Sequence, residues 1–182
     1  MKTLLLTLDF INDIVHPDGK VARSVPYLAG HNVIQHANDA IAQARAVGQL
    51  IAHVKVGFSP SYVECPRQSP VFGKAPEFGA LQLGAWGTEF HEDLAIEATD
   101  KVIVKHRVSA LYNTDLEIVL RANQIERVRL CGVATNMAVE TTARELHDRD
   151  YHVEILADAC GTLNREMHEA ALASLARVAI IS

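Results

Sequence analysis

The stretch RVRLCGVATNMAVETTARELHDRDYHVEILA, residues 127–157, contains the pattern that decides the fold. The apolar run at 127–133 predicts a buried strand, residues 137–149 predict a helix, and residues 151–157 predict a second strand. A strand, a helix and a strand in this order form a unit with parallel strands and a right-handed connection. The turn after the first strand lies at a strand's carboxyl end, where sheets of this kind bind ligands.

The rest of the chain continues this alternation on both sides of that unit. The stretch 57–92, which holds most of the prolines, is predicted to be a long loop, a kind of segment that is often functional. We therefore expect one α/β domain over residues 1–182, with a doubly wound, Rossmann-like sheet of six parallel strands and helices on both faces. The further strands are predicted at 3–8, 50–56, 101–105 and 177–181, and the further helices at 32–47, 115–122 (with Thr114 as N-cap) and 165–176.

Composition and charge narrow the location and the partners. The formal net charge of −5 and the lack of a basic patch argue against nucleic acid or an anionic membrane as a partner. The first apolar run ends at Asp9, too early for a signal peptide, and no stretch approaches the roughly 20 apolar residues of a membrane span. Three scattered cysteines (Cys65, Cys131 and Cys160) do not make a disulfide framework. The sequence thus predicts a cytoplasmic protein.

Two charged residues close predicted strands and form a candidate catalytic pair. Asp9 follows the strand at 3–8, and Lys105 ends the strand at 101–105. Taken singly, each has an ordinary structural explanation, because an aspartate can cap a turn and a lysine at a strand end is usually solvated. Together at one sheet edge they could adjust each other's pKa for general acid–base catalysis. The backbone N–H groups that open the next helix after residue 133 could serve as an oxyanion hole.

Four segments of the chain, in this order, resemble one known family: LLTLDFIND (5–13), VKHRVSALYNTDLE (104–117), CGVATNMAVETTARELHDRDY (131–151) and DAC (158–160). The family is the isochorismatase-like hydrolases of the cysteine hydrolase superfamily. The resemblance implies that Asp9 and Lys105 match two members of an Asp–Lys–Cys triad, and the pattern G-V-x-T-x-x-C-V-x-x-T-A places the third member at Ala138. It also implies that the amides of Ala134 and Ala138 stabilise an oxyanion, and that the peptide bond before Ala134 is cis.

The alanine at position 138 leaves three functions open, because it has no nucleophile. The first is hydrolysis of a small metabolite by Asp9 and Lys105 without a covalent thiol intermediate, as in the isochorismatases proper, which cleave a vinyl ether. The second is a cysteine amidohydrolase for amide or ureide C–N bonds whose nucleophile has been replaced. The third is a small-molecule binding protein without catalysis. We expect the first, and none of the three native cysteines is expected to act as a nucleophile.

The resemblance also guides the expected cofactors and assembly, and closeness to the expected site suggests the pocket walls. No metal and no other cofactor are expected, because the segment after 50–56 lacks the D-x-H motif of the nicotinamidase relatives. His53 is predicted to be a satisfied core or edge histidine, and His147, His152 and His168 to be surface residues. Relatives commonly form dimers or larger assemblies, so we expect a homo-oligomer, a dimer or tetramer. The expected pocket walls are Phe10, Trp86, His106, Tyr112 and Asn136.

Overall fold

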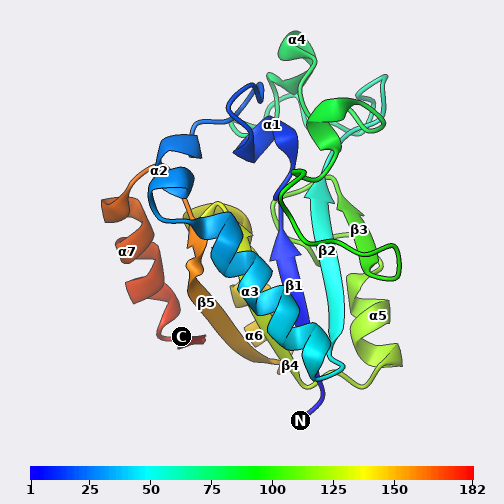
Figure 1. Ribbon diagram of the computed structural model, residues 1–182. Coiled ribbons are helices and arrows are strands. Elements are labelled where there is room, and N and C mark those ends of the chain that lie inside the picture. Colours follow the sequence, from blue (N-terminus) through cyan, green and yellow to red (C-terminus); the bar gives the residue numbers. More distant parts are fainter.

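The structure is a computed structural model that describes residues 1–182, and it contains one sheet of six parallel strands (Figure 1). The sheet order is β3-β2-β1-β4-β5-β6, so the chain starts at the centre, moves to one edge and then returns to fill the other half. This doubly wound order confirms the predicted fold class. The strands are β1 (Thr3–Leu8), β2 (Leu50–Val56), β3 (Lys101–Lys105), β4 (Arg127–Val133), β5 (His152–Gly161) and β6 (Ile180–Ile181).

Helices cover both faces of the sheet. Helix α3 crosses the face toward the viewer in Figure 1, and α6 lies behind the sheet. The helix α3 buries the apolar stripe that its sequence predicts, from Val33 to Ala44. None of the helices combines the length and hydrophobicity that a membrane span requires. The helices are α1 (Asn12–Val15), α2 (Val25–Gly30), α3 (Val33–Ala46), α4 (Ala75–Phe78), α5 (Leu116–Ala122), α6 (Glu140–His147) and α7 (Arg165–Leu175), with a 3₁₀ turn η1 (Trp86–Thr88) and a π-helical turn η2 (Thr135–Val139).

Two predicted boundaries in the second half of the sheet need correction. Strand β5 runs on to Gly161 rather than ending at residue 157, because its last residues pair with the end of β4 after a register shift. Strand β6 contains only two residues, whereas the apolar run 177–181 predicted five. The first four predicted strands have the observed bounds.

Strands β1 and β4 approach each other closely at the centre of the sheet, and a glycine makes this possible. Leu8 and Gly132 are register partners. Gly132 has a φ of 141°, and a Cβ placed there would lie 2.3 Å from the carbonyl oxygen of Leu8. Any larger residue would push the ends of the two strands apart. These are the strand ends that carry Asp9 and the η2 turn.

The predicted loop 57–92 has a small hydrophobic core of its own. The main core contains 36 buried residues around the sheet, and a second cluster of nine lies under this loop. Phe58 is at its centre and packs edge to face on Phe72, with ring centroids 5.5 Å apart. Leu81 belongs to the same cluster. The loop is therefore packed against the carboxyl end of the sheet, where it contributes to the site.

Candidate active site

Asp9 and Lys105 form a buried ion pair at the carboxyl ends of β1 and β3. The Lys105 Nζ lies 2.7 Å from Asp9 Oδ2, and the two residues are 3% and 1% exposed. Lys105 Nζ also donates to the carbonyl oxygen of Val108 at 2.8 Å. Asp9 has a φ of 58°, a left-handed conformation that is uncommon outside glycine and that aspartate adopts more readily than most residues. The structure thus brings the two predicted charged residues together.

The Asp9 carboxylate has one oxygen that the protein does not use. Its Oδ1 is buried and has no hydrogen-bond partner. Burial raises the pKa of Asp9, because it disfavours the charged carboxylate. The Lys105 ammonium and the Val56 backbone partly offset this by lowering the same pKa. Buried polar atoms are nearly always paired in proteins, so an unpaired carboxylate oxygen marks a place where a ligand can bind.

A cavity of about 200 Å³ opens beside this pair. That volume is below the roughly 300–1,000 Å³ of pockets for drug-sized ligands, so it suits a small metabolite. Apart from Asp9 and Lys105, Ser24 is its one polar lining residue. The other walls are apolar: Ile14, Val21, Val56, Val71, Phe72, Leu81, Val108, Val133, Ala134, Met137 and Ala138.

The turn after β4 forms one wall of the cavity. The peptide bond between Val133 and Ala134 is cis, and η2 follows directly. Ala134, Met137 and Ala138 line the cavity, with Ala138 only 4% exposed. π-Helical turns are rare and occur frequently at functional sites.

A buried histidine supports this turn from behind. His168 Nδ1 lies 2.8 Å from the hydroxyl of Thr135, the first residue of η2. His168 is 8% exposed, so the prediction of a surface position was wrong. Burial lowers its pKa, which favours the neutral ring. The sequence hid this role because α7 presents His168 toward η2, a contact between segments far apart in the chain.

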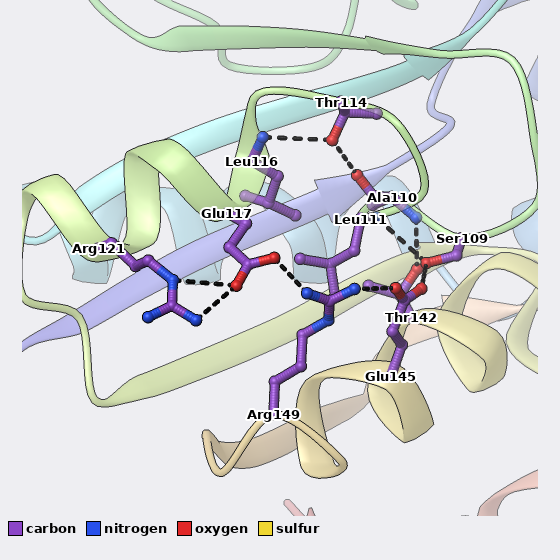
Figure 2. Close-up of polar contacts among 10 residues, drawn as sticks. All are labelled: Ser109, Ala110, Leu111, Thr114, Leu116, Glu117, Arg121, Thr142, Glu145 and Arg149. Atoms are coloured by element: carbon purple, nitrogen blue, oxygen red, sulfur yellow. Dashed lines mark hydrogen bonds and ion pairs between the residues drawn. The ribbon is translucent and has the colours of Figure 1, made fainter.

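The loop after β3 is tied to helix α6 (Figure 2). The Thr142 hydroxyl accepts a hydrogen bond from the amide of Ala110 at 3.1 Å, and Ser109 donates to the Glu145 carboxylate. Arg149 contacts Glu145 on its other side at 2.7 Å. Because Val108 lies in this loop and accepts a hydrogen bond from Lys105, these contacts help to hold the ammonium group in place.

None of the five predicted pocket walls lines the cavity. Phe10 is fully buried in the main core. Trp86 is 46% exposed and packs against His16, with ring centroids 5.0 Å apart. Tyr112 is 59% exposed. His106 Nδ1 lies 2.6 Å from the carbonyl oxygen of Gly57, and Asn136 Oδ1 accepts from the Thr162 hydroxyl at 2.7 Å.

The cavity walls that sequence reasoning missed come mainly from loops. A buried aspartate, Asp13, holds two of these walls in position. Its carboxylate accepts hydrogen bonds from the amides of Leu81 at 2.6 Å and Lys20 at 3.2 Å. Leu81 lines the cavity itself, and Lys20 precedes the lining residue Val21. Asp13 lies four residues after Asp9, in the segment 5–13 that resembles the family. Its place in that segment was the sequence feature that could have pointed to its role in positioning the cavity walls.

The three cysteines lie outside the cavity lining and are buried. Burial raises the pKa of Cys160 to about 12 and that of Cys131 well above its ordinary value. The pKa of Cys65 is raised for the same reason. Thiols of this kind are poor nucleophiles at neutral pH.

Histidines, cysteines and carboxylates do not form a group of three or more that could hold a metal ion. His53 is completely buried, with Nδ1 2.7 Å from the Thr7 hydroxyl and Nε2 3.2 Å from Asp100. This confirms the prediction that His53 is a satisfied core histidine.

Comparisons with known proteins agree on one family. A family model of the isochorismatase domain matches residues 3–182. The uncharacterized isochorismatase family protein YecD of Escherichia coli O157:H7 is 36% identical over 138 residues, which cover 75% of this chain and 70% of YecD. The ureidoacrylate amidohydrolase RutB of Methylobacterium radiotolerans is 34% identical over 187 residues, which cover 95% and 72% of the two chains. The crystal structure of a pyrazinamidase/nicotinamidase from Streptococcus mutans UA159 superposes with a TM-score of 0.85 and 25% identity over 100% of both chains.

Proposed function

This chain belongs to the isochorismatase family, and on that premise we propose that it hydrolyses a small metabolite with Asp9 and Lys105, without a covalent thiol intermediate. The observation that carries the proposal is the unpaired Oδ1 of Asp9 beside a buried ammonium group, at the wall of a small cavity. A carboxylate in such a place can accept a proton from water and return it to a leaving group.

The proposed reaction uses water as the nucleophile. With a carbonyl substrate, Asp9 Oδ1 takes a proton from a water molecule while the water oxygen attacks the carbonyl carbon, and it then gives this proton to the leaving heteroatom. One water is consumed, and no group of the protein is changed at the end. The Lys105 ammonium and the backbone amides of Ala134 and Ala138 stabilise the negative charge that develops on the substrate.

Position 138 supports a route without a covalent intermediate. Ala138 lines the cavity and has no nucleophilic atom. The family pattern would place a cysteine there, and the three native cysteines are buried away from the cavity. Water is therefore the available nucleophile beside Asp9.

A panel of substrates tests the proposal directly. Vinyl ethers, amides and ureides are offered to the wild-type protein, and product is followed by mass spectrometry. We expect turnover of at least one class, with a large loss in Asp9→Asn. Turnover that survives in Asp9→Asn, or that thiol alkylation abolishes in a substrate-protectable way, would overturn the proposed chemistry.

A second candidate function is hydrolysis of an amide or ureide C–N bond, which the similarity to the ureidoacrylate amidohydrolase favours. In that case, Ala138→Cys would restore the covalent route. The new thiol would lie beside Lys105 and the start of a helix, which lower a thiol pKa, so it should be alkylated faster than the native cysteines. An increase in amidase activity in this variant would favour the second candidate over the first.

The third possibility, binding without catalysis, makes a different prediction. No class in the panel would be turned over, while a ligand would still raise the unfolding temperature by mass action. A thermal-shift screen with the same compounds therefore separates a binding protein from an enzyme.

We also propose that the protein assembles as a homo-oligomer in the cytoplasm. The expected mass is that of a dimer or tetramer by light scattering at micromolar concentration. A monomer mass would contradict the assembly.

A further inference from the structure

The polar groups of the cavity are few and their charges cancel. Of its fourteen lining residues, eleven are hydrophobic, and the remaining three are Asp9, Lys105 and Ser24. Asp9 and Lys105 carry opposite charges 2.7 Å apart, and Ser24 is neutral. Each member of the pair is the other's counter-ion, so together they add no net charge to the cavity.

A charged ligand group would have no free counter-ion in this cavity. Lys105 is already paired with Asp9, and no arginine or second lysine lines the walls. Moving a carboxylate from water into such a place costs far more than moving a neutral amide or hydroxyl that finds hydrogen bonds. The cavity should therefore distinguish ligands by their net charge.

The hydrogen-bonding capacity left over in the pair is specific. An ammonium group has three N–H donors, and Lys105 uses one toward Asp9 and one toward the Val108 carbonyl. One donor remains, next to the acceptor Oδ1 of Asp9 that has no partner. Ser24, 8% exposed, adds a hydroxyl on another part of the wall.

We propose that the cavity binds a small uncharged molecule that presents a hydrogen-bond donor and an acceptor side by side to Asp9 and Lys105, and that it excludes carboxylates. The apolar walls receive the remainder of the ligand. This inference rests on the proposed function only for the location of the site. It separates the chain from the ureidoacrylate amidohydrolase RutB, because an acrylate carries a carboxylate.

Matched pairs of neutral and anionic ligands test this selectivity without any turnover. The probes are benzamide with benzoate, and the smaller propionamide with propionate, titrated at pH 8 into the ¹⁵N-labelled protein by NMR. We expect each amide to bind at least about tenfold more tightly than its carboxylate, with shifts at Ala134, Met137 and Ala138; a tenfold difference needs only about 1.4 kcal/mol. Equal or tighter binding of the carboxylates, or no binding of either amide, would overturn the inference.

The Asp9→Asn variant gives a sharper second measurement. It removes the negative charge but keeps the shape, so Lys105 becomes an unpaired cation in the cavity. We expect benzoate to bind at least about tenfold more tightly to this variant than to the wild type. The matched control is Asp18→Asn, which removes the same charge from a side chain that is 86% exposed, and which should leave the amide preference intact. An unchanged preference in Asp9→Asn would show that the ion pair does not set the selectivity.

The outcome is independent of the proposed hydrolysis. Amide-selective binding without turnover in the substrate panel would refute the hydrolase and leave the selectivity standing. Turnover of an anionic substrate, together with tight binding of benzoate, would support the hydrolase and refute the selectivity.

Discussion

Two buried polar clusters lie close together along β1, and only one of them faces a cavity. The first, which we call the His53 cluster, consists of Thr7, His53, Asp100 and Arg45. His53 is bonded on both ring nitrogens, and Arg45 lies 2.6 Å from Asp100. The second is the Asp9 pair with Lys105, which begins two residues later and leaves Asp9 Oδ1 without a partner.

The difference between these clusters shows how a buried polar group with a structural role can be told from one that is available to a ligand. Both contain titratable groups with shifted pKa values, so a shifted pKa does not by itself identify a site. The His53 cluster fastens the segment before β3 to the centre of the sheet and has no ring nitrogen left for a ligand. The Asp9 pair has an unused acceptor at the wall of a cavity. The unused Oδ1 of Asp9 is what distinguishes a candidate ligand site from a cluster with a purely structural role.

The largest expected effect concerns turnover in the Asp9 pair. Asp9→Asn should reduce kcat by about 10²–10⁴-fold, the usual contribution of a general acid–base group. The corresponding change in the His53 cluster, Asp100→Asn, should leave kcat near the wild-type value as long as the protein is folded. Steady-state kinetics on a substrate from the panel measure both. A similar loss of kcat in the two variants would show that the Asp9 pair and the His53 cluster do not differ in function.

The next effect concerns stability. Lys105→Met leaves the Asp9 carboxylate buried without a counter-ion, and the free energy of unfolding should fall by about 3–5 kcal/mol. Addition of Asp9→Asn should recover much of this loss. Arg45→Met should cost less, because the Arg45 side chain is 30% exposed and Asp100 keeps its contacts with His53 and the amide of Glu97. Urea denaturation of the wild type and these three variants gives the values, and a larger loss in Arg45→Met than in Lys105→Met would contradict this expectation.

A smaller effect is expected where the loop after β3 meets α6 (Figure 2). Thr142→Val removes the acceptor of the buried Ala110 amide and should lower the free energy of unfolding by about 1–3 kcal/mol. Thr142→Ser keeps the hydroxyl and should retain most of the stability. Because this loop also carries Val108, the valine variant should lower kcat more than it raises KM. Equal behaviour of the two variants would show that the hydroxyl contributes nothing.

The smallest effect is a pair of opposite pH dependences, each at most about 1.4 kcal/mol per pH unit for one proton. Burial raises the pKa of Asp9, so its contribution to stability is present below the ordinary aspartate pKa and is lost as pH rises through the folded value. Burial lowers the pKa of His53, so its contribution is present above the ordinary histidine pKa and is lost as pH falls toward the folded value. Unfolding curves from pH 3 to 8 for wild type, Asp9→Asn and His53→Gln would resolve these contributions. Slopes of equal sign would contradict the opposite directions in which burial moves the pKa values of Asp9 and His53.

Much of the fold and the central pair could be predicted from the sequence. Apolar runs that end in a charged residue located β1 and β3, and parallel strands place such endings at one sheet edge, which brought Asp9 and Lys105 together. The cavity walls could not be predicted in the same way. Phe72 and Leu81 reach the site from a loop without periodicity, and their positions depend on the second core and on Asp13.

The wall residues that were expected instead illustrate the reason. Phe10 and His106 directly follow Asp9 and Lys105 in the sequence, but they lie outside the cavity lining. Phe10 packs into the main core, and His106 bonds the carbonyl of Gly57. Proximity in the sequence to Asp9 or Lys105 therefore does not predict that a side chain lines the cavity.

The π-helical turn η2 has a consequence for how this site can change over evolutionary time. Its wide turn holds one more residue than an ordinary helical turn could, between the end of β4 and the regular helix α6. Loss of a single codon among residues 135–139 would let the turn tighten into an α-helix while both flanking elements keep their sequences. The side chains on the two sides of the deletion would then rotate by about 100° relative to each other. A deletion at 135 or 136 would therefore rotate Met137 and Ala138 together relative to β4 and away from the cavity that they line, so the length of this turn is constrained independently of which residue occupies position 138.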